Sequence, residues 1–299
     1  MEDDGLRHSE IATNGIRLHV VAAGPPDGPP VILLHGFPEF WYGWRHQIGP
    51  LAEAGFRVIV PDQRVYGTSE KPAPVSSYAL DTLADDVAGL IESTGHPRAA
   101  IVGHDWGGIV AWWVAVRNPG LVERLAVLNA PHPVAFRRFL RSSPLQLLRS
   151  WYTFYFQLPG VPEAMFRRRN WRALARGMST SSRPGTFTEA DFDRYRAAWS
   201  EPGAIAGMIH WYRAAMRDRP ATPPEIRVDS PALVIWGAKD KFLGRGLGPA
   251  SLDLCDDGRL EVIEEASHWV QHEEPERVNR LLIGFLREAS RPDSRRRAT

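Results

Sequence analysis

An aspartate occupies the centre of a motif that enzymes usually build around a serine. Residues 102–108 read VGHDWGG, so Gly103 and Gly107 stand two positions before and after Asp105. In the serine version, a sharp turn between a strand and a helix lifts the nucleophile clear of the sheet, and bulky neighbours would collide with that turn. A carboxylate is ionised at neutral pH and needs no base to activate it. The motif predicts that Asp105 is a nucleophile, although a lone aspartate at such a turn often only caps the helix.

A carboxylate nucleophile sets requirements for the rest of the chain. Its attack on a saturated carbon leaves an alkyl ester, and hydrolysis of that ester needs a water, a base and donors for the developing oxyanion. The backbone N–H of Trp106, directly after the nucleophile, is one expected donor. The second is expected from the loop HGFP after the apolar segment PVILL, where Phe37 stands. These two N–H groups form the predicted oxyanion hole.

The base and the acid that orients it are expected late in the chain, because folds with this motif order their triad as nucleophile, acid and histidine. His268 follows the last predicted strand, in the segment EEASHWVQ. Asp240 follows the segment PALVIW and is the candidate acid, with a solvated surface aspartate as the alternative. His272 would add a zinc interpretation, but H-W-V-Q-H lacks the glutamate of the H-E-x-x-H motif. We therefore predict no metal and no cofactor.

Two further polar residues near these motifs are expected to be structural. His104 precedes the nucleophile and should point away from the reacting groups. Asp62, in the segment PDQR after another predicted strand, is expected to pair with Arg64.

Short apolar segments alternate with helical patterns, which is typical of a mostly parallel sheet covered by helices on both faces. The nucleophile motif joins one such segment to a helix. The predicted strands are residues 16–23, 30–34, 57–60, 99–102, 122–128, 231–236 and 259–263. The predicted helices are residues 44–54, 80–93, 106–117 and 275–288.

Residues 131–224 lack buried strand patterns and hold four of the 11 tryptophans and four of the seven tyrosines. This segment is predicted to be a helical cap over the carboxyl edge of the sheet, between core segments 1–130 and 225–299. Its first part, residues 131–183, has a local net charge of +9, with Glu163 as its one acid. Either these arginines are solvated or paired with acids of the core, or they attract anionic amphiphilic substrates. The arginines are residues 137, 138, 141, 149, 167, 168, 169, 172, 176 and 183.

Composition limits the remaining possibilities. A net charge of +1 over 299 residues gives no overall attraction to nucleic acid, and the arginine-containing end at 291–299 is expected to be a tail. Cys255 is the single cysteine, which fits a reducing compartment, and no apolar run is long enough for a membrane span. We predict a cytoplasmic protein that acts on a small molecule as a monomer or a homodimer.

Together the motifs resemble the soluble epoxide hydrolases of the α/β-hydrolase superfamily. The resemblance runs over about residues 11–288 and rests on HGFPEFWYGWR, DQRVYG, GHDWGG, the Y-x-x-Y-F-Q-x-P-G pattern, HWYR, the aspartate after PALVIWGAK, and SHW. It implies an α/β-hydrolase fold with a cap and conversion of an epoxide into a vicinal diol through an ester on Asp105. Opening an epoxide releases an alkoxide that needs a proton, and tyrosine, with a pKa of about 10, remains protonated at pH 7.

The resemblance implies particular tyrosines for that role. In the family the first lies five residues before the glutamine of F-Q-x-P-G, which is Tyr152, and the second belongs to W-Y-R, which is Tyr212. Tyr155 is then a packing neighbour. Val65 departs from the family, which commonly has glycine there, and it touches a loop expected near the mouth of the site.

Two other functions remain open. Haloalkane and haloacetate dehalogenases share the aspartate nucleophile, but the former carry asparagine where this chain has Phe37 and the latter carry arginine where it has Trp106. A non-catalytic ligand-binding protein on the same fold is the third possibility, and a complete set of nucleophile, acid and base argues against it.

Overall fold

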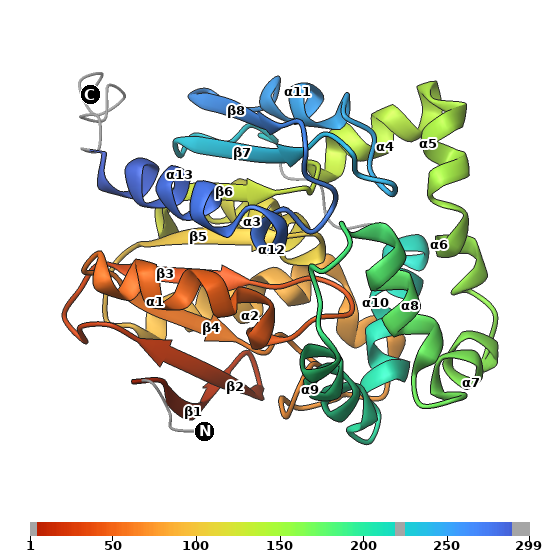
Figure 1. Ribbon diagram of the computed structural model, residues 1–299. Helices are drawn as coiled ribbons and strands as arrows, with labels where there is room; N and C mark the ends of the chain where they lie inside the picture. Colours follow the sequence, from red (N-terminus) through yellow and green to blue (C-terminus); the bar gives the residue numbers. More distant parts are fainter. Residues whose placement is uncertain (1–4, 219–224, 289–299) are drawn as a thin grey trace.

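An eight-stranded sheet forms the centre of the computed structural model, which describes residues 5–218 and 225–288 (Figure 1). The strand order is β1-β2-β4-β3-β5-β6-β7-β8. The β2 strand pairs antiparallel with β1 and β4, and the pairs from β4 across to β8 are parallel. The strands are β1 (Arg7–Thr13), β2 (Ile16–Ala23), β3 (Pro30–Leu34), β4 (Arg57–Pro61), β5 (Ala99–His104), β6 (Val122–Leu128), β7 (Ala232–Gly237) and β8 (Gly258–Ile263).

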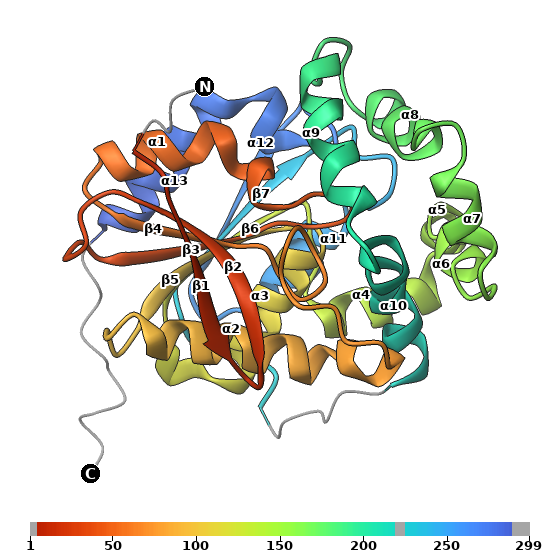
Figure 2. The same ribbon diagram turned by 90° about the horizontal axis from the view of Figure 1, so that it is seen from below.

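Helices cover both faces of the sheet, as the alternating pattern predicts (Figures 1 and 2). The α1 (Arg45–Glu53), α12 (Val270–Glu273) and α13 (Pro275–Arg287) helices lie on one face, and α2 (Leu80–Ser93), α3 (Trp106–Arg117) and α11 (Leu247–Leu252) lie on the other. Alternate side chains of each strand enter the two cores: Val234 packs with the α2 and α3 side, and Leu233 with the α1 and α13 side. Short 3₁₀ helices occur at η1 (Trp41–Trp44), η2 (Val75–Tyr78) and η3 (Pro119–Leu121).

A helical insert lies between β6 and β7 and forms a cap at the carboxyl edge of the parallel strands (Figure 1). The cap has no strand among its described residues, in agreement with its missing strand patterns. Its helices are α4 (Pro133–Ser142), α5 (Pro144–Arg149), α6 (Trp151–Tyr155), α7 (Val161–Arg167), α8 (Arg172–Ser181), α9 (Glu189–Ser200) and α10 (Ala204–Arg217).

The parallel register brings several loops to the same edge of the sheet. Leu34 at the end of β3 pairs with Gly103 of β5, and His104 pairs with Leu128 at the end of β6. The β7 and β8 strands end together, with Gly237 opposite Ile263. Consequently the loops that carry the predicted oxyanion donor, nucleophile, acid and base all begin at the carboxyl edge of the parallel strands, which the cap covers.

The β1 strand was not predicted from the sequence. Its segment RHSEIAT has one fully buried residue, so it lacks the apolar signal of the inner strands. It pairs with β2 over its whole length at the edge of the sheet. The predicted helix at 44–54 is divided into η1 and α1, and the other predicted elements occur with ends that differ by a few residues at most.

Candidate active site

Asp105 lies on a strained turn between β5 and α3, at φ 50° and ψ −122°. This turn packs so closely on its neighbours that side chains are excluded around it. A Cβ atom on Gly107 would lie 2.1 Å from the carbonyl oxygen of Leu34, and one on Gly36 would lie 2.4 Å from the Cβ atom of Asp105. The glycines of the motif therefore allow the turn, and the turn presents the carboxylate at the edge of the sheet.

The carboxylate of Asp105 does not cap the helix that follows it. No capping hydrogen bond is made by this side chain, and its Oδ1 atom accepts a hydrogen bond of 2.9 Å from the backbone N–H of Phe37. Trp106 is the first residue of α3, so its N–H has no acceptor within that helix. One of the two predicted oxyanion donors thus already contacts the carboxylate, and the other belongs to the adjacent residue.

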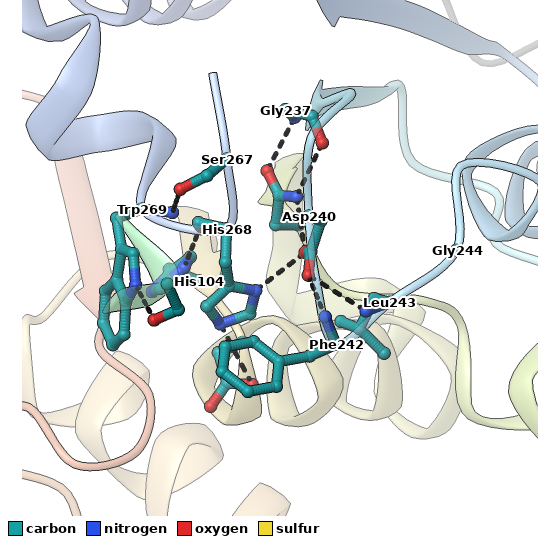
Figure 3. A network of polar contacts seen from close by, with 12 residues as sticks. His104, Gly237, Asp240, Phe242, Leu243, Gly244, Ser267, His268 and Trp269 are labelled. Atoms are coloured by element: carbon teal, nitrogen blue, oxygen red, sulfur yellow. Dashed lines mark hydrogen bonds and ion pairs between the residues drawn. The ribbon is translucent and has the colours of Figure 1, made fainter. Parts of the chain in front are cut away.

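The imidazole of His268 lies between the carboxylates of Asp240 and Asp105, and Figure 3 shows its contact with Asp240. Its Nδ1 atom is 2.8 Å from Oδ2 of Asp240, and its Nε2 atom is 3.6 Å from Oδ2 of Asp105. Both His268 and Asp240 are buried, whereas the side chain of Asp105 is 16% exposed. The structure therefore brings the three residues of the predicted triad together, with His268 between Asp105 and Asp240.

Asp240 is held by donors that the sequence did not reveal. The backbone N–H groups of Phe242 and Leu243 donate to its Oδ1 atom at 2.7 and 2.9 Å (Figure 3). The side-chain amide of Asn129, at the end of β6, donates to its Oδ2 atom at 2.7 Å. Asn129 also accepts from the N–H of Gly237, which ties two strand ends together. The one available sequence signal for Asn129 was its position directly after a buried strand.

Electrostatics favours a charged His268. Burial alone would lower its pKa, but the carboxylates of Asp240, Asp105 and Glu39 outweigh burial and raise the pKa to about 9. Burial likewise opposes ionisation of Asp240, yet the neighbouring His268 lowers the pKa of this carboxyl below its ordinary value. At neutral pH the pair is therefore an imidazolium hydrogen-bonded to a carboxylate.

A cavity of about 230 Å³ lies between the triad and the cap. Asp105 and His268 line it from the core side, and Tyr152 of α6 and Tyr212 of α10 line it from the cap. The two tyrosine rings are neighbours, with centroids 5.9 Å apart. Burial, followed by the charge of Asp105, raises the pKa of both hydroxyls above the usual value, so both remain protonated.

Tyr155 lines the same cavity but is oriented differently. Its hydroxyl donates to the sulfur of Met165 at 3.1 Å, near the protein surface. The remaining wall of the cavity is mainly aromatic and aliphatic, and suits an apolar ligand. Those residues are Phe37, Pro38, Trp151, Phe156, Met165, Phe166, Ala173, Leu174, Gly177, Met178, Phe242 and Trp269.

A second polar network lies behind His268 and is centred on Glu39, for which the sequence holds no motif of its own. His272 approaches its Oε1 atom at 2.8 Å, and His104 approaches Oε2 at 3.3 Å. Tyr195 of the cap helix α9 donates its hydroxyl to Oε1 at 2.7 Å. His104 also contacts the backbone oxygen of His268 at 2.9 Å. The network thus joins the cap to the backbone of the candidate base.

This network also accounts for His272. Its second ring nitrogen, Nδ1, lies 3.0 Å from the guanidinium of Arg45. Burial and the nearby arginine keep the pKa of His272 low despite the opposing carboxylate of Glu39. His268 and His272 therefore contact different carboxylates, and residues 5–218 and 225–288 contain no cluster of three or more ligands suited to a metal ion.

Two expectations from the sequence are wrong. Asp62 does not pair with Arg64: its carboxylate contacts Nδ1 of His19 at 2.7 Å and accepts from the N–H of Trp41. Arg64 instead makes two hydrogen bonds to Asp86 of α2, because the chain after β4 turns its side chain toward that helix. Val65 was expected near the mouth of the site, but it is fully buried and is not among the residues that line the cavity.

The chain matches the family model of the alpha/beta hydrolase fold over residues 29–275. It is 46% identical to the AB hydrolase superfamily protein YfhM of Bacillus subtilis. The alignment of 284 residues covers 95% of this chain and 99% of that protein. It is 38% identical to epoxide hydrolase 4 of Mus musculus, and the alignment of 289 residues covers 95% of this chain and 80% of that relative.

Solved structures agree with these sequence relatives. A crystal structure of an epoxide hydrolase from Bacillus megaterium in complex with an inhibitor has a TM-score of 0.84 and 32% identity, over 94% of this chain and 100% of that one. In the part of the chain that the structure describes, no helix is long and apolar enough to cross a bilayer. The chain belongs to the alpha/beta hydrolase family, within the group that contains the epoxide hydrolases.

Proposed function

We propose that the protein is an epoxide hydrolase that converts an epoxide into a vicinal diol through an alkyl ester on Asp105. One observation carries the proposal: a carboxylate and a pair of protonated tyrosines line opposite walls of one apolar cavity. The core, residues 1–130 and 225–299, supplies the nucleophile, and the cap, residues 131–224, supplies the proton donors. Relatives named as epoxide hydrolases support the same activity.

In the first step, Oδ2 of Asp105 attacks one carbon of the epoxide. A carbon–oxygen bond forms to the carboxylate as the ring carbon–oxygen bond breaks, and the ring oxygen takes a proton from Tyr152 or Tyr212. Oδ1 remains at the N–H of Phe37, where the 2.9 Å hydrogen bond holds it. The step therefore needs an ionised aspartate and a neutral tyrosine, and both are expected at pH 7.

In the second step, His268 removes a proton from a water that attacks Cγ of the ester. The negative charge that develops on Oδ1 is stabilised by the N–H groups of Phe37 and Trp106, and collapse of the intermediate releases the diol. Between the two steps the tyrosinate takes a proton from the imidazolium of His268, so that the tyrosine is restored and His268 becomes neutral. After the second step His268 is again an imidazolium, as at the start, and the departing diol oxygen takes the proton that remains on the carboxyl of Asp105. His268 must be neutral for this step, and the first step helps, because esterification removes one of the charges that raise its pKa.

No observation favours a dehalogenase. A departing halide is a stable anion that needs no proton, so two protonated tyrosines would have no role in its release. Tyr152 and Tyr212 do have a role when the leaving oxygen stays attached to the substrate as an alkoxide.

The covalent ester provides the decisive test. Asp105 should still open an epoxide in a His268→Gln variant, while hydrolysis of the ester should be slowed by orders of magnitude. Intact-mass spectrometry should then show the protein with one added substrate mass, and peptide mapping should locate it on Asp105. A His268→Gln variant that turns over at the parent rate would refute the mechanism, and halide release without diol formation across paired substrates would refute the activity.

A further inference from the structure

The outer edge of the cap exposes an unusual concentration of large apolar side chains. Nine such residues are exposed in the part of the chain that is described, and eight of them fall between positions 145 and 165. Leu148 is 69% exposed and Trp151 is 62% exposed. We call this surface the α5–α7 face. Its eight residues are Leu145, Leu147, Leu148, Trp151, Phe154, Leu158, Val161 and Met165.

The helices that carry the α5–α7 face lie far from the sheet (Figures 1 and 2). In both views the helices α5, α6 and α7 form the outermost part of the cap, farthest from the sheet (Figures 1 and 2). Because eight of the nine exposed large apolar side chains of the described residues lie on these neighbouring helices (Figure 1), we treat them as an interaction surface.

Exposed arginines flank the α5–α7 face in the sequence. Eight exposed arginines precede or follow residues 145–165 in the chain, and none of them makes a salt bridge with another described residue. The single acid of this part of the cap is neutralised, because the buried carboxylate of Glu163 contacts the guanidinium of Arg213 at 2.6 Å. Of the ten arginines in residues 131–183, Arg183 is the one paired with core acids, Glu273 and Glu274. The eight are Arg137, Arg138, Arg141, Arg167, Arg168, Arg169, Arg172 and Arg176.

The cavity of the candidate active site shares residues with the same surface. Trp151 and Met165 belong to the α5–α7 face and also line the cavity. Ala173 and Gly177 line it from α8, the helix that carries Arg172 and Arg176. Residues of the α5–α7 face and of the helix that carries two of the arginines therefore both contribute to the wall of the cavity.

We infer that the α5–α7 face docks on the surface of an anionic lipid bilayer. Its leucines, Trp151 and Phe154 would enter the region between headgroups and acyl chains, where aromatic side chains are favoured, and the arginines would contact the anionic headgroups. A second copy of this chain fits the face less well, because a two-fold axis would bring arginine-rich rims against each other. In the docked state an apolar substrate can pass from the bilayer into the cavity without crossing water; this consequence alone rests on the proposed function.

Sedimentation with lipid vesicles tests the docking directly. The full chain is mixed with vesicles of phosphatidylcholine alone, or with an added third of phosphatidylglycerol, and the bound fraction is measured. Binding to the anionic vesicles is expected, together with its loss as salt is raised. A triple Arg167→Gln, Arg168→Gln, Arg169→Gln variant should bind on the order of a hundredfold more weakly, at about fivefold for each arginine near the surface. A Leu148→Ser, Phe154→Ser variant should bind at least about tenfold more weakly.

Matched controls separate the face from general effects of charge and hydrophobicity. Arg280→Gln removes an exposed arginine from α13, on the far side of the molecule (Figure 1). Met216→Ser removes the one large apolar side chain outside the face that is exposed among residues 5–218 and 225–288. Both should bind like the parent protein. Equal binding to neutral and anionic vesicles, or no binding to either, would overturn the inference. So would a parent dimer that the Leu148→Ser, Phe154→Ser change converts to a monomer in light scattering. The assay contains no substrate, so its outcome is independent of the proposed activity.

Discussion

The Nε2 atom of His268 lies 3.6 Å from Oδ2 of Asp105, so the candidate base and the candidate nucleophile share an electrostatic environment. Burial opposes protonation of His268, and the charge of Asp105 is one of three that overcome it and raise its pKa to about 9. An imidazolium cannot accept a proton from water. In the proposed mechanism, the charge of Asp105 therefore keeps His268 from acting as a base until Asp105 has formed the ester.

Neutralising Asp105 should consequently lower the pKa of His268. We expect an NMR titration of His268 to give a pKa below about 9 in the Asp105→Asn variant and near 9 in the parent protein. In single-turnover experiments, epoxide opening should change little over roughly pH 6 to 8, while ester hydrolysis should rise with pH as His268 loses its proton. An Asp105→Asn variant with an unchanged His268 pKa would contradict this coupling.

The raised pKa also has a consequence for stability. Since the pKa of His268 in the folded protein, about 9, exceeds the value of about 6.5 for an unfolded chain, its proton stabilises the fold fully at low pH. That contribution is lost as the pH rises through about 9. Asp240→Asn, which removes the main partner of His268, should flatten this part of the stability profile in thermal unfolding.

The two cap tyrosines are expected to share the proton-donor role. Tyr152→Phe and Tyr212→Phe should each slow epoxide opening, on the order of tenfold to a hundredfold, because one hydroxyl remains on the cavity wall. The double variant should be nearly inactive. Tyr155→Phe is the matched control, since the hydroxyl of Tyr155 already contacts Met165. Stopped-flow measurement of the opening step distinguishes the variants, and a larger loss in Tyr155→Phe would exchange the roles of Tyr152 and Tyr155.

Activity should survive exhaustive removal of metal ions. The nucleophile is ionised without help and the tyrosines supply the proton, so the proposed chemistry has no step for a metal. His272, the alternative ligand, is engaged by Glu39 and Arg45. Turnover is measured before and after treatment with a chelator. Loss of turnover that zinc restores would return the zinc interpretation of His268 and His272.

Sequence patterns located those parts of the molecule that follow from local rules. Seven strands were visible as apolar segments, and Asp105, Asp240 and His268 were found because each comes shortly after one of them. The β1 strand was missed because it exposes most of its side chains. Asn129 and Glu39 were missed for another reason: each is a single polar residue whose partners lie far away in the chain, as Tyr195 does for Glu39. Only folding brings such pairs together, so spacing carries no signal for them.

Val65 and Gly207 form a contact of the same long-range kind. Val65 has φ 82°, in the left-handed region that disfavours a β-branched residue, and it packs against α10. A Cβ atom on Gly207 would lie 2.1 Å from a methyl group of Val65. Gly207→Ala should therefore destabilise the protein by about 1–3 kcal/mol in denaturant unfolding. Combining it with Val65→Gly should recover part of that loss, which measures the coupling.

Gly284→Ala provides the control for this pair, because the same change within α13 meets no atom within 4 Å. Helix propensity predicts that it stabilises the protein by up to about 1 kcal/mol. If Gly207→Ala changes the free energy of unfolding in the same way as Gly284→Ala, then Val65 does not pack closely on α10.

The cap arginines also bear on which epoxides the protein captures. Eight of them are exposed, and Arg172 and Arg176 belong to α8, which lines the cavity, so they should attract a substrate that carries a negative charge. We expect kcat/KM for an epoxy fatty acid to fall as salt is raised, because the Debye length is about 10 Å at 0.1 M and screening shortens the reach of the arginines. The neutral methyl ester of the same acid should respond little. In low salt, an Arg172→Gln, Arg176→Gln variant should lower kcat/KM for the acid but not for the ester, and Arg280→Gln should lower neither. Parallel responses of acid and ester to salt would show that the arginines do not select the substrate.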